Sequence, residues 1–203
     1  MKTHLLIIRH AKSIANENGM FGGITDYPLS EVGSIQAEDL SKRLKKYEID
    51  KIYSSPLKRA KQTITPYATS INKDIIIVDD LIEINVGSWE DQPRDELRKK
   101  FPEINRKIDE TEFYTGMDGQ EETIDVANRM FNAITELAKE NCDKTIIIVS
   151  HVVAIRAFLC KILNIPFEET KSKIGNLGNT SITKVDYDLE NNEYNVIELG
   201  SMK

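Results

Sequence analysis

The stretch Thr3-His4-Leu5-Leu6-Ile7-Ile8-Arg9-His10 decides the fold that we predict for this chain. Its centre, residues 5–8, is entirely apolar and ends abruptly at an arginine and a histidine. A short apolar run with polar borders is typical of a strand that is buried on both faces of a parallel sheet. In open α/β sheets, ligands bind just outside the carboxyl ends of such strands. Arg9 and His10 are therefore expected at a ligand site.

A second stretch, Thr145-Ile146-Ile147-Ile148-Val149-Ser150-His151, repeats this arrangement. The chain has three histidines, and two of them, His10 and His151, directly follow its clearest buried strands. Because ligand chemistry gathers at the carboxyl ends of such strands, we consider what the two rings could do together.

Length and composition fit one domain over residues 1–203. A formal net charge of −6 argues against a nucleic-acid partner. No apolar stretch is long enough to cross a membrane, and residues 1–20 do not resemble a signal peptide, so we expect a cytoplasmic protein without a membrane partner. Cys142 and Cys160 lie far from each other and from any histidine, which argues against a zinc site or a disulfide framework. The oligomeric state cannot be inferred.

The first predicted helix follows a polar, glycine-containing loop, residues 11–27. Ser30 is expected to be its N-cap, and Ile35, Leu40 and Leu44 are expected to form its apolar stripe.

The rest of the chain continues the alternation of strands and helices. We expect a strand over 49–54, a helix after Pro56 that Pro66 bends or ends, a strand over 75–78, an irregular segment over 79–91, short helices and loop over 93–118, a helix over 122–140, a helix over 153–163, and strands over 182–187 and 194–199. This order predicts a three-layer α/β/α sandwich with a mainly parallel central sheet.

Five side chains at or after the predicted strand ends could together perform phosphoryl transfer: Arg9, His10, Arg59, Glu83 and His151. Imidazole is a nucleophile that is neutral near pH 7, and arginine binds phosphate oxygens with two parallel hydrogen bonds. A second, protonated histidine could hold a further oxygen. A carboxylic acid whose pKa is raised by its surroundings could protonate the leaving alkoxide. This chemistry needs no metal and no cofactor.

The ordered motifs of the chain resemble the histidine phosphatase superfamily, in its phosphoglycerate mutase-like branch. The resemblance covers nearly the whole chain and rests on Arg9-His10-Ala11-Lys12-Ser13-Ile14-Ala15-Asn16, Asp26-Tyr27-Pro28-Leu29-Ser30, Gly33, Gln36-Ala37, Ile52 to Ala60, Gln62-Thr63, Leu81 to Glu90, Val149-Ser150-His151 and Gly178 to Ile182.

The resemblance implies a role for each matching position. His10 would be transiently phosphorylated, and Arg9, Arg59 and His151 would complete the phosphate pocket. Glu83 falls on the proton donor of the family. The remaining positions would contact phosphate or substrate: Ser13, Asn16, Gly22, Gly23 and Val152. The implied ligand is a small phosphorylated metabolite or inorganic phosphate.

Several positions depart from the family pattern. Ala11 and Val152 replace glycines that usually follow the two histidines, and we expect their backbone N–H groups still to serve the phosphate in a tighter pocket. A substitution where φ is positive would be more damaging, with Val152 the worse case. Lys12 adds a positive charge beside the site, and residues 119–122 read Gly-Gln-Glu-Glu where Gly-Gly-Glu-Ser is usual, which leaves the distal substrate contact open.

Our leading hypothesis is a metal-independent phosphomonoesterase that acts through a phosphohistidine. The first alternative is a phosphoglycerate mutase, but mutases of this type carry Glu-Arg-His-Tyr-Gly and a Gly-Leu-Asn-Lys stretch, whereas residues 83–90 here read Glu-Ile-Asn-Val-Gly-Ser-Trp-Glu. The second alternative is a non-catalytic module that binds a phosphorylated ligand, which only Ala11 and Val152 favour. The substrate cannot be named from sequence, because it depends on the loop at 17–27 and on residues 84–120.

Overall fold

The computed structural model describes all 203 residues. Its strands are β1 (Lys2–Arg9), β2 (Lys51–Ser54), β3 (Ile75–Ile77), β4 (Thr145–Ser150), β5 (Ile182–Asp188) and β6 (Glu193–Ser201). Its α-helices are α1 (Ile14–Glu17), α2 (Glu31–Leu44), α3 (Lys58–Ser70), α4 (Arg94–Lys100), α5 (Pro102–Thr111), α6 (Thr123–Glu140), α7 (Val152–Leu163) and α8 (Thr170–Ile174). Short 3-10 helices are η1 (Asp79–Leu81), η2 (Gly87–Trp89) and η3 (Phe167–Glu169).

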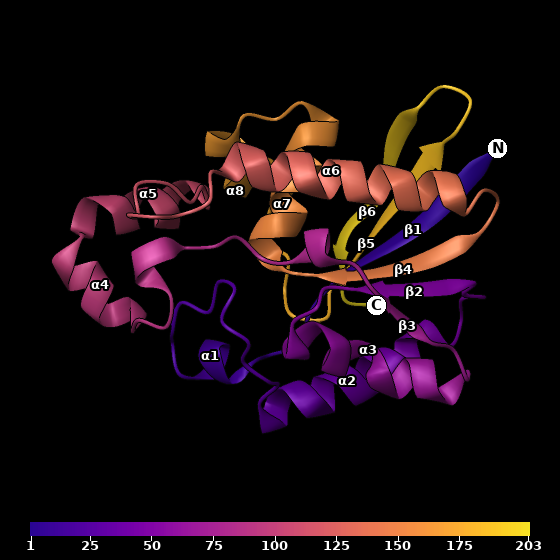
Figure 1. The fold of residues 1–203 in the computed structure, drawn as a ribbon, viewed down its shortest axis with the longest axis horizontal. Coiled ribbons are helices and arrows are strands. Elements are labelled where there is room, and N and C mark those ends of the chain that lie inside the picture. The colour runs from indigo at the N-terminus through magenta and orange to yellow at the C-terminus, as the bar shows by residue number, and fades with distance from the viewer.

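The six strands form one sheet in the order β3-β2-β4-β1-β5-β6. The first four are mutually parallel, and β5 and β6 are added in antiparallel pairs. Helices α2 and α3 lie on one face of the sheet, and α6 and α7 lie on the other (Figure 1). The predicted three-layer fold with a mainly parallel sheet is therefore confirmed.

The apolar run of β1 is continuous because its side chains enter two different cores. Leu5 and Ile7 pack in the cluster that contains α6 and α7, whereas Leu6 and Ile8 pack in the cluster that contains α2 and α3. Successive strand residues point to opposite faces, so a strand covered on both sides must be apolar at every position.

One expectation about the helices on the α2–α3 face is wrong, and of the two effects expected of Pro66 one does not occur. Ile35 is 71% exposed, because the buried stripe of α2 runs through Ala37, Leu40 and Leu44, and Ile35 lies on another face of the helix. Pro66 does not end α3, which continues to Ser70 because Tyr67, just after the proline, is buried against the core. The N-cap at Ser30 is confirmed, since its side chain accepts a hydrogen bond from the Gly33 N–H.

Helices α4 and α5 form a lobe with the connection to α6, residues 91–122, beyond the carboxyl ends of the parallel strands (Figure 1). Helix α1 and the glycine-containing loop after it lie at the same end of the sheet. None of the helices is long and apolar enough to span a membrane.

Candidate active site

The ends of three parallel strands bring four of the five predicted chemical groups together. Arg9 ends β1, and in the sheet it pairs with Ser150, the last residue of β4. His10 and His151 follow these two residues, and their ring centroids are 5.0 Å apart. Arg59 comes from the first turn of α3, which follows β2. The neighbouring strand ends thus produce the cluster that the sequence predicts.

His10 holds its proton on one defined nitrogen. Its Nδ1 lies 2.6 Å from the carbonyl oxygen of Ala11, which can only accept a hydrogen bond. The proton therefore sits on Nδ1, and Nε2 carries the free lone pair. Burial lowers the pKa of His10 well below its usual value, and the charges of Arg59 and Arg9 lower it further. His10 is consequently a neutral imidazole with an available nucleophilic nitrogen.

Arg59 is held on three sides. Its Nε donates to Nδ1 of His151 at 3.2 Å, its Nη1 to the Thr25 carbonyl at 2.8 Å, and its Nη2 to the Gly23 carbonyl at 2.5 Å. Since arginine can only donate, His151 accepts at Nδ1 and uses its Nε2–H toward Ser55 Oγ, 2.7 Å away. Burial and the charge of Arg59 lower the pKa of His151 well below its usual value. The expected protonated second histidine is therefore wrong for this structure, in which His151 is neutral and orients Arg59.

Arg9 supplies a second guanidinium, which is partly buried. Its Nη1 donates to the Leu177 carbonyl at 2.6 Å, and its buried Nε has no partner in the protein. Burial lowers the pKa of Arg9 to about 10, partly compensated by Glu83, so the group remains charged near neutral pH. A cation this poorly solvated is well suited to bind an anion.

Glu83 lies in the segment after η1, and its carboxylate meets the N-terminus of α7. One oxygen accepts from the N–H groups of Ile84 at 3.0 Å and Ala154 at 2.9 Å, and the other accepts from the N–H of Val153 at 3.2 Å. Backbone donors and a helix N-terminus stabilise an ionised carboxylate. Three backbone donors thus fix both oxygens of the Glu83 side chain beside the cavity.

The remaining predicted contact residues also line the pocket. Ser13 and Asn16 form a capping box at α1, in which each side chain binds the backbone N–H of the other. Gly22 and Gly23 border the pocket from the loop that follows α1. Together with the charged groups they surround one cavity, from which only His151 is excluded because it is fully buried behind Arg59.

The two positions where glycine is usual are not strained. Neither Ala11 nor Val152 has a positive φ, so a side chain is accommodated at both. The Ala11 N–H donates to Oγ1 of Thr63 at 2.8 Å, so the expectation that it serves the phosphate is wrong. The Val152 N–H, at the first position of α7 beside the cavity, makes no bond within the protein.

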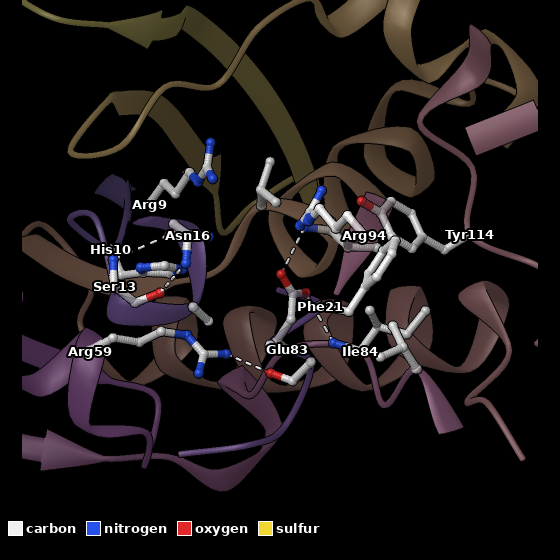
Figure 2. A pocket seen from close by; sticks show the side chains of 16 residues that line it. Arg9, His10, Ser13, Asn16, Phe21, Arg59, Glu83, Ile84, Arg94 and Tyr114 are labelled. Atoms are coloured by element: carbon white, nitrogen blue, oxygen red, sulfur yellow. Dashed lines mark hydrogen bonds between the residues drawn. The ribbon is translucent and has the colours of Figure 1, made fainter. Parts of the chain in front are cut away.

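Sequence analysis missed seven residues that line the pocket, and three of them carry aromatic or charged side chains: Phe21, Arg94 and Tyr114. The guanidinium of Arg94 lies over the Phe21 ring, 4.5 Å from its centroid, and its Nε donates to the Met20 carbonyl at 3.2 Å. These residues lie across the cavity from the phosphate-binding group, with Glu83 between the two sets (Figure 2). The only sequence signal was the position of Arg94 directly after Pro93, at a helix start, which does not reveal where the side chain points.

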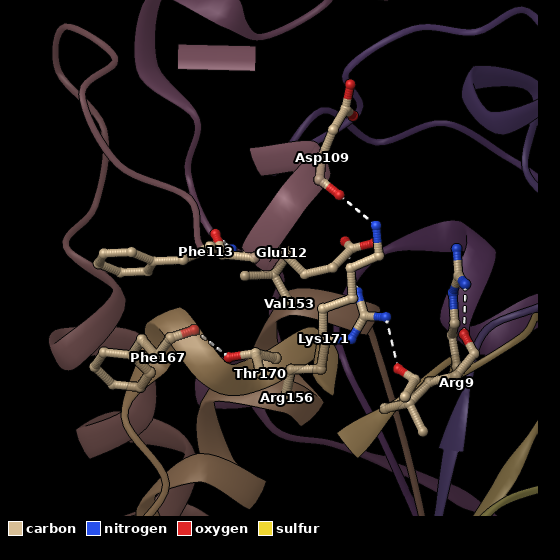
Figure 3. Close-up of polar contacts among 12 residues, drawn as sticks. Arg9, Asp109, Glu112, Phe113, Val153, Arg156, Phe167, Thr170 and Lys171 are labelled. Carbon is tan, nitrogen blue, oxygen red and sulfur yellow. Dashed lines mark hydrogen bonds and ion pairs between the residues drawn. The ribbon is translucent and has the colours of Figure 1, made fainter. Parts of the chain in front are cut away.

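The lobe that carries Tyr114 is attached to the main body by a nearly buried ion pair. Arg156 of α7 donates to Glu112 at 2.8 Å, and next to it the rings of Phe113 and Phe167 stack with centroids 5.6 Å apart (Figure 3). Because Tyr114 follows these residues directly, the attachment fixes its place in the pocket wall.

No group of three or more His, Cys, Asp or Glu side chains is arranged to hold a metal ion. The pocket instead gathers three guanidinium groups, from Arg9, Arg59 and Arg94, around one carboxylate, Glu83. With His10 neutral, the lining carries a surplus of positive charge and can bind a small polyanion.

The family model of the histidine phosphatase superfamily (branch 1) matches residues 5–199. This chain belongs to that superfamily.

Two of the curated proteins similar to this chain are phosphoserine phosphatases. Phosphoserine phosphatase 1 of Hydrogenobacter thermophilus is 36% identical over 161 residues, covering 79% of this chain and 76% of that protein. A metal-independent phosphoserine phosphatase of Arabidopsis thaliana is 32% identical over 186 residues, covering 90% and 76%. The structure of the phosphoserine phosphatase of Entamoeba histolytica in complex with 3-phosphoglyceric acid matches with a TM-score of 0.83 at 26% identity, covering 99% and 98%. The chain is thus a phosphatase of the phosphomonoesterase type.

Proposed function

We propose that this histidine phosphatase hydrolyses a small phosphorylated carboxylic acid of the phosphoserine type, without a metal and through a phosphohistidine on His10. The observation that carries the proposal is the state of His10: a neutral ring with its proton on Nδ1 and its Nε2 free, next to the positive charges of Arg59 and Arg9. Such a ring is ready to attack phosphorus, whereas a binding protein has no use for a nucleophile there.

In the first step, Nε2 of His10 forms a bond to phosphorus while the bond to the leaving oxygen breaks. Arg9 and Arg59 bind the equatorial phosphoryl oxygens, where charge accumulates, and the Val152 N–H at the N-terminus of α7 adds a neutral donor. Phosphoryl transfer depends mainly on such positioning and charge neutralisation, which preorganised arginines supply. The leaving alkoxide takes a proton from the carboxyl of Glu83.

In the second step, the ionised Glu83 takes a proton from a water molecule, whose oxygen attacks phosphorus and displaces His10. Inorganic phosphate leaves, and the proton on Glu83 serves the next substrate. The three backbone donors around its carboxylate fit this second half of the cycle, in which the group must be ionised.

The second anionic group of the substrate is inferred from Arg94. It lines the cavity on the side across from Arg9 and Arg59, where it could meet the end of a substrate that does not react. A guanidinium binds a carboxylate with charge-assisted hydrogen bonds. Phosphoserine carries both groups, and two relatives above are phosphoserine phosphatases.

A phosphoglycerate mutase remains the alternative that Arg94 also permits, because its substrate carries a carboxylate as well. The two reactions differ only in whether water or a second substrate takes the phosphoryl group from His10. The non-catalytic module loses its support, since Ala11 and Val152 are unstrained.

The test is release of phosphate from phosphoserine, 3-phosphoglycerate and p-nitrophenyl phosphate in the presence of a chelator, with wild type and His10→Ala side by side. We expect chelator-resistant release from wild type, fastest with phosphoserine, and none from His10→Ala. Phosphate that binds wild type by calorimetry without any release from these substrates would overturn the phosphatase proposal. Conversion of 3-phosphoglycerate to 2-phosphoglycerate without release would favour the mutase.

A further inference from the structure

Glu90, directly after η2, does not line the cavity, yet its carboxylate binds the loop that does. One oxygen accepts from the N–H groups of Ile24 and Val86, each at 3.0 Å. The other accepts from the N–H of Thr25 at 3.1 Å and from its Oγ1 at 2.8 Å. Both oxygens are therefore fully used, and all four donors belong to segments around the pocket.

The same loop binds Arg59 on its other side. The carbonyls of Gly23 and Thr25 accept from the two η nitrogens of Arg59, while the amides of residues 24 and 25 point to Glu90. The peptide groups of this short loop thus lie between an anion and a cation, in the orientation that both charges favour. The loop therefore connects the carboxylate of Glu90 to the guanidinium of Arg59.

The fit between Glu90 and the loop is close. A Cβ placed on Gly23, whose φ is +37°, would lie 1.7 Å from Oε1 of Glu90. Only glycine permits both this approach and this backbone conformation. The contact to Val86 joins the loop to the segment that begins with Glu83. Glu90 therefore binds both the loop that holds Arg59 and the segment that carries Glu83, two residues that line the cavity.

We propose that Glu90 is a positioning residue of the phosphate pocket, which holds the guanidinium of Arg59 in place through the carbonyls of Gly23 and Thr25. The proposal deepens the proposed function and rests on it for the role of Arg59. Asp26, a neighbouring carboxylate, makes a different contact. It accepts from the backbone N–H of Lys58 and not from a donor of the loop segment that binds Arg59.

Glutamine cannot replace Glu90 at this place. Its amide nitrogen would face two donors that now meet an oxygen, and its neutral side chain would no longer align the loop. We therefore expect Glu90→Gln to let Arg59 move away from the phosphoryl oxygens while leaving its charge intact.

The experiment is a double-mutant cycle of Glu90→Gln and Arg59→Ala, read as kcat/KM for p-nitrophenyl phosphate and as the inhibition constant of inorganic phosphate. Glu90→Gln alone should lower kcat/KM by about 100-fold, as expected for a small misplacement of a reacting group, and should raise the inhibition constant. In the Arg59→Ala background the same change should have an effect below about threefold, because the group through which it acts is absent. Glu96→Gln, an exposed carboxylate on α4, is the matched control and should match wild type.

Equal effects of Glu90→Gln in both backgrounds would overturn the proposal and leave Glu90 with a structural role only. Thr25→Val, which removes one donor to Glu90, supplies a milder second variant should Glu90→Gln fail to fold, and its loss of activity should also vanish with Arg59→Ala. If wild type shows no turnover, the proposed function fails, but calorimetric binding of inorganic phosphate to the same four proteins still tests Glu90.

Discussion

The phosphate-binding half of the pocket and the wall that faces it are built in different ways. Arg9, His10 and His151 stand at the ends of adjacent strands. Backbone carbonyls fix the side chains of Arg9 and His10, and the side chains of Arg59 and Ser55 fix His151. The wall comes from the loop around Phe21 and from the lobe that carries Arg94 and Tyr114, which is attached to the main body by ion pairs of Glu112 with Arg156 and of Glu121 with Arg129.

Because of this difference, we expect the strand ends to carry out the reaction and the facing wall to select the substrate. The strand ends cannot move without disturbing the sheet, so the phosphate half should act equally on every phosphomonoester. The lobe lies beyond the sheet and can vary without changing the fold, so we expect it to be the part that distinguishes substrates.

The largest effect is expected in the phosphate half. Arg9→Ala should lower kcat/KM by roughly 100- to 1000-fold for phosphoserine and for p-nitrophenyl phosphate alike, because it removes a buried donor to the transferring oxygens. Steady-state kinetics with both substrates measure this. A loss confined to phosphoserine would mean that Arg9 acts in substrate selection, and it would contradict the division between the phosphate-binding half and the wall.

A change in the wall should be selective. Arg94→Met keeps the contact with the Phe21 ring but removes the charge, so kcat/KM for phosphoserine should fall about 10- to 100-fold, the value of a charge-assisted hydrogen bond. Turnover of p-nitrophenyl phosphate, which has no carboxylate, should change little. Equal losses with both substrates would contradict the assignment of Arg94 to a carboxylate.

The buried neutral histidines of the phosphate half should make stability depend on pH. His10 and His151 have pKa values lowered in the folded state, so between pH 6.5 and 5 the unfolded chain takes up protons that the folded chain does not. The free energy of unfolding should therefore fall as the pH decreases, by up to about 1.4 kcal/mol per pH unit for each histidine. Urea unfolding of wild type and His10→Asn at several pH values measures this pH dependence. The free energy of unfolding of the mutant should change less with pH. Identical slopes would show that His10 is not neutral by burial.

The smallest effect is expected at Val152. Because its φ is not positive, Val152→Gly should gain no activity and should change kcat by less than about threefold. It should lower the free energy of unfolding by about 1 kcal/mol, through lost burial and backbone freedom at the start of α7. Activity assays and thermal unfolding test this, and a large gain in kcat would mean that the valine obstructs the phosphate.

The sequence predicts the phosphate half because its signals are local. An apolar run followed by Arg9 and His10 marks both the strand and the edge at which ligands bind, and the same holds for His151. Glu83 needed the family pattern, since it stands among other acidic residues in an irregular segment.

The wall could not be predicted for a physical reason. Arg94 and Tyr114 reach the cavity only through the packing of a lobe made of two short helices, held by contacts between Arg156 and Glu112 that are 44 residues apart. The protonation states were equally hidden, because the neutral ring of His151 follows from its contact with Arg59 in the folded protein. Helix periodicity also misled at Ile35, where an apolar residue faces away from the core.

The most direct test of the central claim is the reaction of Glu83→Gln with p-nitrophenyl phosphate, followed by rapid mixing and an alkaline quench that preserves phosphohistidine. Nitrophenolate is a good leaving group that needs no proton, so the first step should proceed, whereas hydrolysis of the phosphoenzyme lacks its base. We predict a stoichiometric burst of nitrophenolate and a phosphoryl group on the peptide that contains His10. Turnover without a burst and with no phosphoryl group on His10 would contradict the phosphohistidine mechanism.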